Sequence, residues 1–336
     1  MVFSKNAQFP ITRKKGVFII VTLKDIAKAC DVSVSTVSRA FDKTSRISDP
    51  VRQRILSCAT EMGYTPNLIA RSLKSNRTMT IALIIPSIEN RFYIDVLKHL
   101  EIQAHQYGYR LLVSFIQPGI TTERECLEMM TSAQVDGIIM IPEYTTDESF
   151  IMSLRERMAI IQLFSNPYSG IDSVIMDDDG GAEAGTDYLA RHNHRRILFV
   201  GGENRRTGFW RAVDKANIPH EQIRTLHDLA TLDEIVTAIQ EFCPTAVFSV
   251  GDANEYVWKA IQKLELSIPE DISLIVYDNT KWISLVGLTA IGHNLEQIAE
   301  TVIQQLLKRL NDDADPSPVH LVLDPFIVER KSVRSL

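Results

Sequence analysis

The 336-residue sequence has little cysteine and no long apolar segment. Its four cysteines are far apart and form no C-x-x-C pair, which argues against a disulfide framework or a structural zinc site and favours a reducing compartment. No apolar run approaches the roughly 18–20 residues that a membrane span requires. The apolar stretch 16–21 is short, is followed by Lys24 and has no A-x-A cleavage site, so it makes a poor signal peptide.

Short motifs of common catalytic chemistry are also absent. The sequence contains no G-x-x-x-x-G-K-[ST], G-x-G-x-x-G, G-x-S-x-G or H-E-x-x-H. His192-x-His194 could suggest a metal site, but it leads into a predicted strand. The run 177–179 of three aspartates precedes two glycines and a predicted helix, where acidic residues favour the N-terminal dipole. We therefore predict no metal, no cofactor, no catalytic residue and no enzymatic activity.

Charge is unevenly distributed along the chain. The composition is that of a globular protein, with 45% hydrophobic and 23% charged residues. The length fits roughly two to three domains. Residues 1–78 carry 14 Lys and Arg against 5 Asp and Glu, whereas the remaining residues carry 22 against 37. A basic head on an acidic body indicates a phosphate-binding, and hence nucleic-acid-binding, head.

Three helices are predicted in this basic head. The first begins at the N-cap Thr22, the second spans 34–41 after the N-cap Ser33, and the third follows Ser48 and stops at Gly63. Two short helices joined by a tight turn and braced by a third form a helix-turn-helix, whose second helix presents its first turn to the major groove. The alternative is a small helical bundle with solvated serines, which the basic charge disfavours.

Polar side chains on the outer face of the second helix can contact DNA. Small hydroxyls bond bases or phosphates, and arginine binds guanine with two hydrogen bonds or grips a phosphate. The residues predicted to contact DNA in this region are Thr22, Ser33, Val34, Ser35, Thr36, Ser38 and Arg39.

Two segments resemble the headpiece of the lactose-repressor (LacI) family of bacterial transcription regulators: VTLKDIAKACDVSVSTVSR at 21–39 and GYTPNLIARSLK at 63–74. The resemblance implies that Val34 and Ser35 largely set operator preference and that Arg39 reads a base. Asp31 stands where the family usually has glycine in the turn; aspartate tolerates the left-handed conformation, so we expect the turn to survive.

The second of these segments contains a hinge-like stretch. By the resemblance, residues 67–74 form a hinge helix that folds on operator DNA and enters its minor groove. Asn67 and Ala70 are then further DNA contacts, and Leu73 is an apolar wedge that kinks the duplex. Without the family, Leu73 would be interpreted as a core leucine of a short linker helix.

After Thr80 the sequence alternates apolar strands with amphipathic helices. The predicted strands are 81–85, 109–115, 137–141, 160–163, 197–200, 246–250 and 272–276; the predicted helices include 96–107, 123–133, 182–192, 235–242 and 255–266. This alternation predicts parallel sheets covered on both faces, either one large sheet or two smaller ones. Ligands of such sheets bind beyond the carboxyl ends of the strands.

This body resembles the periplasmic-binding-protein-like core of the same family, with signatures such as Val-Asp-Gly-Ile at 135–138, Arg-Arg-Thr-Gly-Phe at 205–209 and Tyr-Asp at 277–278. The implied fold is a small all-α helix-turn-helix headpiece plus an α/β core of two Rossmann-like lobes with parallel sheets. The implied divisions are an N-terminal extension 1–20, a DNA-binding domain 21–66, a hinge and linker 67–78, a core 79–330 and a tail 331–336. Within the core, 79–176 with 291–318 forms one lobe and 177–290 with 319–330 the other. The extension is either a flexible arm or upstream sequence from a mis-assigned start, and we favour the second.

A small effector in the cleft between the lobes follows from the resemblance. Its predicted contacts are Asn90, Phe92, Phe164, Arg205, Asp252 and Asp278. Arg205 stands at the family's effector-binding arginine, and its alternative role is that of a surface arginine at a helix N-terminus. Asp252 and Asp278 match acidic positions of the cleft, where a carboxylate accepts hydrogen bonds from sugar hydroxyls, although each could instead be a loop or cap residue.

Several positions depart from the sugar-binding pattern of the family. Phe164 stands where many members have aspartate, Val276 replaces a glycine, and the loop between Gly202 and Arg205 is short. Arg91 replaces the usual proline at the cleft mouth, and an additional arginine there suits a phosphorylated or acidic effector. Together these departures weaken the assignment to any sugar. From the resemblance, the effector is still predicted to be a sugar or a sugar phosphate.

The sequence as a whole predicts a cytoplasmic, nucleoid-associated repressor of a carbohydrate uptake or catabolism operon. It is expected to bind a pseudo-palindromic operator as a homodimer, because one three-helix head spans one half-site. The six residues after Arg330 leave no room for a heptad tail, which favours a dimer over a tetramer. The alternative is a solute-binding or sensing protein of periplasmic-binding-protein fold, and an enzyme that uses two cleft carboxylates is a distant third. No membrane partner is expected.

Overall fold

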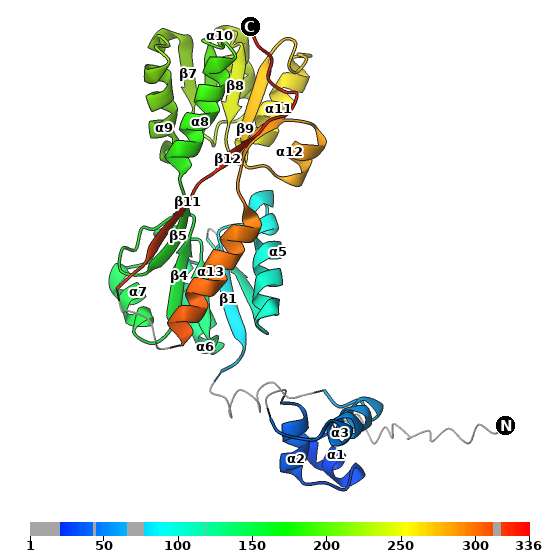
Figure 1. Cartoon of the computed structure of the whole chain (residues 1–336). Helices are drawn as coiled ribbons and strands as arrows, with labels where there is room; N and C mark the ends of the chain where they lie inside the picture. The colour runs from blue at the N-terminus through cyan, green and yellow to red at the C-terminus, as the bar shows by residue number, and fades with distance from the viewer. Residues whose placement is uncertain (1–20, 43–44, 66–76, 118, 312–316) are drawn as a thin grey trace, which may run out of the picture. The chain divides into compact units, whose positions relative to one another are not determined.

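The computed structural model describes residues 21–42, 45–65, 77–117, 119–311 and 317–336. The chain separates into two compact units, a head within residues 1–76 and a body within 77–336 (Figure 1). In the part of the chain that is described, no helix is both long enough and apolar enough to cross a bilayer.

The head consists of the three predicted helices: α1 (Leu23–Ala29), α2 (Val34–Ala40) and α3 (Asp49–Glu61). Thr22 and Asp25 form a capping box at α1, in which the Thr22 hydroxyl and backbone N–H both donate to the Asp25 carboxylate. In the turn, Asp31 adopts a left-handed φ of 49°. The turn therefore forms without glycine, as expected from the tolerance of aspartate for this conformation.

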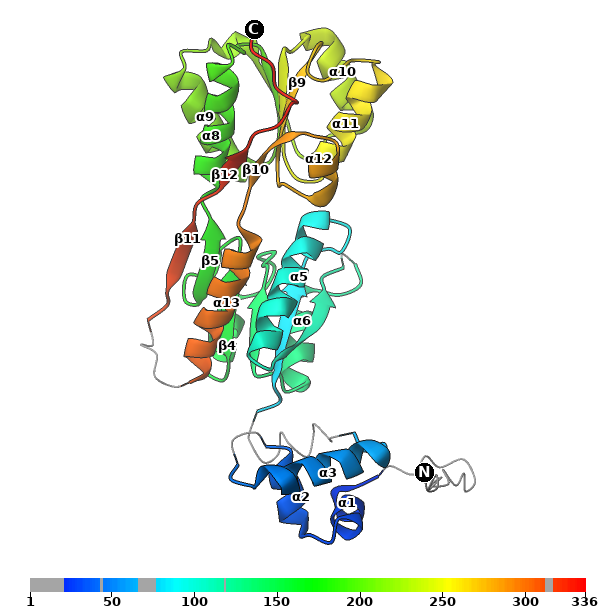
Figure 2. The same cartoon turned by 45° about the vertical axis from the view of Figure 1, so that its right-hand side comes forward.

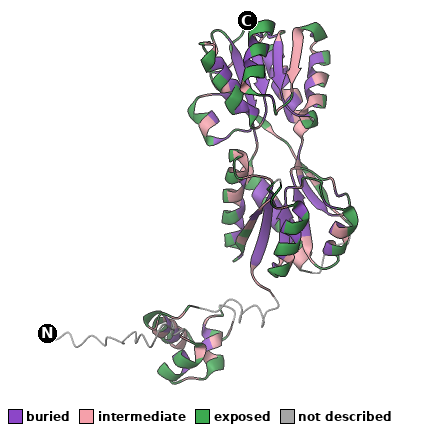
Figure 3. Ribbon diagram, turned by 180° about the vertical axis from the view of Figure 1, so that it is seen from behind, coloured by how far each residue is buried: buried purple, intermediate pink, exposed green. Residues whose placement is uncertain are grey.

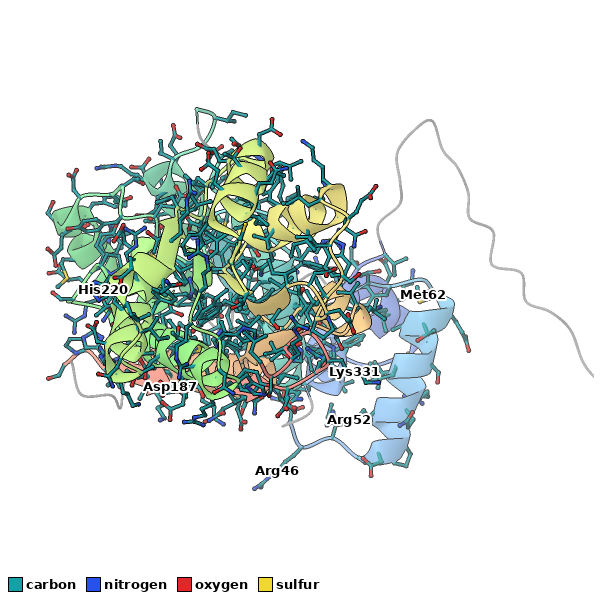
Figure 4. All side chains as sticks on the ribbon, turned by 90° about the horizontal axis from the view of Figure 1, so that it is seen from above. Arg46, Arg52, Met62, Asp187, His220 and Lys331 are labelled. Carbon is teal, nitrogen blue, oxygen red and sulfur yellow. The ribbon has the colours of Figure 1, made fainter. Side chains whose placement is uncertain are left out.

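The core of the head is small and apolar. It is formed by seven buried residues contributed by all three helices: Ile26, Ala27, Cys30, Val37, Ala40, Ile55 and Ala59. Arg52 of α3 ties the end of α2 to the following loop, because its guanidinium donates to the carbonyls of Ala40, Asp42 and Ser45. Although Arg52 adds to the basic charge of the head, its hydrogen bonds give it a structural role. Arg46, by contrast, extends away from the helices of the head (Figure 4).

The first lobe of the body is a six-stranded parallel sheet in the order β11-β5-β4-β3-β1-β2. Its strands are β1 (Thr80–Ile85), β2 (Arg110–Phe115), β3 (Gly137–Met140), β4 (Ala159–Leu163), β5 (Asp172–Met176) and β11 (His320–Leu323). Helices α5 (Arg91–Gln106) and α13 (Leu295–Leu310) pack on one face, and α6 (Glu123–Ser132) and α7 (Glu148–Arg155) on the other (Figure 2).

The second lobe repeats this arrangement, with the order β12-β10-β9-β8-β6-β7 and β12 antiparallel to β10. Its strands are β6 (Ile197–Val200), β7 (Ile223–Leu226), β8 (Ala246–Ser249), β9 (Ser273–Tyr277), β10 (Thr289–Gly292) and β12 (Phe326–Val328). Helices α8 (Asp178–Arg191) and α9 (Glu203–Lys215) cover one face, and α10 (Leu232–Phe242), α11 (Ala253–Lys263) and α12 (Lys281–Leu285) the other. Figure 3 shows both sheets buried between exposed helix surfaces, the pattern expected of parallel sheets.

Helices α8 and α9 pack closely because of one glycine. A Cβ atom on Gly208 would lie 1.9 Å from the backbone oxygen of Asp179. The backbone N–H of Gly208 also donates to the Asp179 side chain at 3.0 Å. This close packing fixes the first turn of α9, which carries Arg205, against the N-terminus of α8.

The chain passes between the lobes three times, after β5, after β10 and between β11 and β12 (Figure 1). The predicted division at 318/319 is wrong in detail: β11 pairs with β5, so the last crossing lies at 324–325. Residues 291–292 likewise belong to β10 of the second lobe. The short strands β11 and β12 lie at sheet edges and are partly exposed. Their sequences therefore do not indicate which sheet each strand joins.

A buried histidine anchors the end of the chain to the second lobe. His194 is fully buried, and its ring nitrogens lie 3.0 Å from the Thr245 hydroxyl and 3.0 Å from the Arg334 carbonyl. Burial lowers the pKa of His194 to about 4, from an ordinary value of 6.5. His194 thus has partners on both ring nitrogens and precedes β6, which begins at Ile197.

We expect His194 to make the body sensitive to acid. The unfolded chain protonates His194 below pH 6.5 while the folded chain does so only near pH 4, so stability falls as the pH drops between these values. The expected loss at pH 5 is about 2 kcal/mol. Urea unfolding at pH 7 and pH 5 measures it. His194→Gln should have a shallower pH dependence than the wild type, and the exposed His220→Gln should match the wild type. Equal slopes in all three proteins would contradict this role.

Candidate functional site: a DNA-binding head and an inter-lobe cleft

The outer face of α2 presents the residues predicted to read DNA. Val34, Ser35 and Arg39 are exposed, whereas Val37 and Ala40 of the same helix are in the core. Val34 is 41% exposed although it is apolar. The helix therefore has one face committed to packing and an opposite face with an apolar side chain, a hydroxyl and a guanidinium, which suits it to the major groove.

Three other predicted contact residues have hydrogen bonds within the head. The Ser33 hydroxyl caps α2 by accepting from the Thr36 backbone N–H at 3.1 Å, and it lies 2.8 Å from the Thr36 hydroxyl. The hydroxyl of Thr22 is engaged with Asp25. Their backbone and hydroxyl groups lie at helix N-termini, where phosphates bind. Ser38 is half-buried. The predicted contacts Asn67, Ala70 and Leu73 lie outside the described residues.

A cavity of about 390 Å³ lies between the two lobes of the body. All six predicted effector residues line it, three from each lobe. The first lobe contributes Pro86, Asn90, Phe92, Tyr93, Ile141, Pro142, Phe164, Ser165 and Met176, and the second contributes Asp178, Asn204, Arg205, Asp228, Leu229, Val250, Gly251, Asp252 and Asp278; His293 lies at the crossing between them. The volume is that of a small-molecule site.

Most of the polar lining residues follow the carboxyl ends of parallel strands. Asp178 follows β5, Arg205 follows β6, Asp252 follows β8 and Asp278 follows β9. This is the edge at which open α/β sheets bind ligands, because connecting loops and helix N-termini converge there. The short Gly202–Arg205 connection predicted from the sequence corresponds to α9 beginning at Glu203, which places Arg205 in the first turn of that helix.

Arg205 is held in a fixed position on the cleft wall. Its Nη2 lies 3.0 Å from Asp178 Oδ1, and its guanidinium carbon lies 4.2 Å above the centre of the Tyr277 ring. The Tyr277 hydroxyl also donates to Asp178. Burial raises the pKa of Asp178, although Arg205 opposes that shift. Nε of Arg205 is buried and has no hydrogen-bond partner in the described part of the chain, so a donor remains for a ligand.

Asp278 and His293 form a second polar pair at the cleft floor. Asp278 has a left-handed φ of 73°, which directs the loop after β9, and its Oδ1 lies 3.6 Å from His293 Nε2. The His293 ring packs 5.7 Å from Phe92 of the first lobe and 5.5 Å from Tyr277 of the second. His293 thus contacts aromatic rings of both lobes at a chain crossing.

The first-lobe wall of the cleft is aromatic. The ring centres of Phe92 and Phe164 are 5.1 Å apart, and Tyr93 stacks on Phe164 at 6.4 Å. Asn90 caps α5 by accepting from the Phe92 backbone N–H at 2.9 Å, which orients this turn toward the cavity. Burial raises the pKa of Tyr93 to about 12, so its hydroxyl stays protonated. An aromatic wall opposite carboxylates and a guanidinium can hold a ring with polar substituents.

Several lining residues were not predicted from the sequence, among them Tyr93, Asp178, Asp228 and His293. Asp178 belongs to the aspartate run that the sequence suggested as a helix cap, and its neighbour Asp177 does accept from the Gly180 N–H at 2.9 Å. The ion pair of Asp178 with Arg205 depends on the packing of α9 against α8, which the sequence does not show. His293 has no motif, and its position at the crossing is its only signal. Tyr93 is adjacent in sequence to Phe92, which was predicted.

Arg91, which suggested an acidic effector, does not line the main cavity. Its Nε lies 3.3 Å from Glu255 Oε1, and its side chain is 68% exposed. Arg91 lines a neighbouring cavity of about 230 Å³. The additional positive charge at the mouth is therefore matched by a carboxylate of the opposite lobe.

Sequence models of two protein families match parts of this chain. The sequence model described as "Bacterial regulatory proteins, lacI family" matches residues 22–67, and that of a "Periplasmic binding protein-like domain" matches 186–333. The chain is 30% identical to the HTH-type transcriptional regulator DegA of Bacillus subtilis (strain 168), over 94% of this chain and 98% of the relative. It is 27% identical to the HTH-type transcriptional repressor PurR of Histophilus somni (strain 2336), over 94% and 100%.

Solved structures share the fold. The lac repressor bound to ONPG superposes with a TM-score of 0.78, 22% identity and coverage of 93% of this chain and 99% of that one. The CelR–cellobiose complex superposes with a TM-score of 0.64, 22% identity and the same coverage.

A helix-turn-helix head and a two-lobed α/β body with a ligand-sized cleft define a DNA-binding transcription regulator. The chain belongs to the lacI family of bacterial regulatory proteins.

Proposed function

We propose that this regulator represses a carbohydrate uptake or catabolism operon in the cytoplasm. Binding of a small effector in the inter-lobe cleft either lowers or raises its affinity for operator DNA. The observation that carries the proposal is the cavity of about 390 Å³, lined from both lobes, in a chain that also has an exposed DNA-reading helix. A ligand that contacts both lobes binds open and closed arrangements unequally, and only such a difference can shift the equilibrium between them.

The DNA-reading part of the proposal assigns base contacts to Val34, Ser35 and Arg39. Thr22, Ser33, Thr36 and Ser38 are assigned to the phosphates that flank them. The first three lie at or near helix N-termini, where phosphates bind. The hinge stretch 67–74, with Asn67, Ala70 and Leu73, is proposed to enter the minor groove, as in the resemblance noted above.

A homodimer on a pseudo-palindromic operator is the second part of the proposal. One head with one recognition helix spans one half-site. A two-fold-symmetric operator therefore requires two heads. The body supports this, because α5 exposes apolar side chains: Ile94 is 41% and Ile102 43% exposed, and Leu112 of the edge strand β2 is 37% exposed. An apolar helix and an adjacent edge strand are suited to self-association.

The effector is proposed to be a sugar-sized ring. Asp252, Asp278 and Arg205 provide acceptors and donors for ring substituents, and Phe92 and Phe164 provide flat apolar surface. The cellobiose bound by CelR, which shares the fold, supports this class. The alternative of a sugar phosphate has less support, because Arg91 is paired with Glu255.

In vitro selection of random duplexes by the full chain tests the DNA part. We expect an inverted repeat to be selected, and a duplex with one half-site mutated to bind at least tenfold more weakly than the intact repeat. Leu73→Ala should weaken binding to the selected duplex while the urea unfolding of the body is unchanged. Selection of an asymmetric sequence, or unchanged affinity of Leu73→Ala, would contradict the dimer and the hinge assignment respectively.

A further inference from the structure

The cleft contains more acidic than basic groups. Four carboxylates line the main cavity, those of Asp178, Asp228, Asp252 and Asp278, against one guanidinium, Arg205, and the imidazole of His293. The adjoining cavity adds two carboxylates, Glu89 and Glu255, and two cations, Arg91 and Lys259, so it leaves the imbalance unchanged.

Ion pairs within the cleft do not remove this excess. Arg205 is matched by Asp178 at 3.0 Å, and Arg91 by Glu255 at 3.3 Å. Asp228, Asp252 and Asp278 are left over. Burial raises the pKa of Asp252, and the carboxylates of Glu255, Asp278, Asp228 and Glu89 raise it further, which shows that these acidic groups act on one another. Even if His227 beside Asp228 and His293 beside Asp278 both carried a proton, a negative charge would remain.

One of these carboxylates is buried without a hydrogen-bonding partner. The Asp278 side chain is 10% exposed, and within the described ranges its Oδ1 accepts no hydrogen bond; the imidazole Nε2 of His293 is 3.6 Å away. His293 itself is 2% exposed, and its Nδ1 likewise has no partner among described residues. Buried polar atoms are costly unless they are hydrogen-bonded, so an unpartnered carboxylate oxygen in a ligand-sized cavity marks a place for a donor of the ligand.

Aromatic rings line the same cavity as Asp278. Phe92 packs against His293, and Phe164 packs against Phe92. The negative faces of aromatic rings attract cations, as carboxylates do. A phosphate or carboxylate ligand would be repelled by Asp228, Asp252 and Asp278, because Asp178 already offsets the positive charge of Arg205.

We propose that the effector carries a protonated amine, which binds Asp278 and Asp252 beside the Phe92–Phe164 wall, and that the site rejects phosphorylated compounds. This inference rests on the proposed function, since it specifies the chemistry of the effector in the same cleft. An amine on a sugar-sized ring satisfies both the ring size given under the proposed function and the positive charge inferred here.

Matched compounds test the charge preference directly. Glucosamine, galactosamine, mannosamine, ethanolamine and putrescine are compared with glucose, galactose, mannose, ethylene glycol and 1,4-butanediol, and with the 6-phosphates of the three hexoses. Thermal unfolding of the full chain, followed by tryptophan fluorescence at constant ionic strength, detects binding, and calorimetry gives Kd. At least one amine is expected to bind tenfold or more tightly than its neutral partner, and no phosphate should bind better than its parent sugar.

Two variants show whether that binding uses the proposed carboxylate. Asp278→Asn keeps the shape of the side chain and tolerates the left-handed backbone, and it should weaken amine binding at least tenfold. Asp233→Asn removes an exposed aspartate of the same lobe and should have no effect. The inference is overturned if no amine stabilises the wild type, if a phosphate binds more tightly than the matching amine, or if Asp278→Asn binds amines as the wild type does.

Binding to the selected operator duplex, measured in the same samples, separates the two proposals. Specific DNA binding without any amine effect would reject the amine and leave the repressor standing. Amine binding by a chain that selects no DNA sequence would reject the repressor and leave the amine site standing.

Discussion

Arg39→Ala is expected to weaken binding to the selected operator about 10- to 100-fold, with little effect on binding to unrelated DNA. Arg39 is exposed on the same face of α2 as Val34 and Ser35, and its side chain leaves the core of the head untouched. A two-hydrogen-bond contact to a base contributes about 1–3 kcal/mol of discrimination. Fluorescence anisotropy with labelled operator and scrambled duplexes, at one fixed salt concentration, measures both affinities.

A charge-matched control separates base reading from simple electrostatics. Arg191→Ala removes one positive charge from an 80% exposed side chain of the body and should leave both affinities unchanged. If Arg39 only gripped a phosphate, its loss would weaken binding to both duplexes alike and reduce the salt dependence of log Kd by about one. Equal losses on the two duplexes would therefore reject Arg39 as a base-reading residue.

Arg205→Met is expected to abolish the response to the effector and to destabilise the body. The unpartnered Nε and the guanidinium facing the cavity are lost, so effector binding should fall by about 100-fold or more. Asp178, buried and no longer paired, makes the body less stable by about 3–5 kcal/mol. Operator release as a function of effector concentration measures the first effect, and urea unfolding measures the second.

A second variant keeps the functional test separate from the loss of stability. Arg205→Met with Asp178→Asn removes both charges and should recover most of the lost stability, while the effector response stays absent. Arg211→Met, on the exposed side of the same helix, serves as the control and should behave as the wild type. A double variant that releases the operator at the wild-type effector concentration would contradict the role of Arg205 in binding.

Local signals in the sequence were sufficient to predict the head. Caps at Thr22, Ser33 and Ser48 lie at the observed helix starts, and the Gly63 stop has the left-handed φ of 67° that ends a helix. These features depend on residues within one turn of each other. The same holds for the central strands of both lobes, where continuous apolar runs coincide with β1, β3, β6 and β8 to within one residue.

Features that depend on distant contacts were not predicted. Helix α9 is polar over most of its length, and α7 has only eight residues, so neither was predicted. Helix α13 was not among the predicted helices either, although the resemblance did assign its residues to the first lobe.

The same distinction applies to the cleft. The resemblance to the lacI family predicted Asp252, Asp278 and Arg205 as lining residues, and all three line the cavity. The pairing of Arg205 and the remaining negative charge on the cleft wall depend on distances between side chains of different elements. These distances cannot be predicted from local sequence. Sequence reasoning therefore identified the wall of the site and misjudged its charge, since Arg91 pairs with Glu255 on the opposite lobe.

The central claim is that this chain recognises specific two-fold sites on DNA and regulates the genes beside them. Sequencing of all DNA fragments bound by the chain in the cells that encode it tests this claim most directly. The account predicts a few sharp peaks, each centred on an inverted repeat near genes for uptake or breakdown of a small molecule. Diffuse enrichment, or none despite expressed protein, would contradict it.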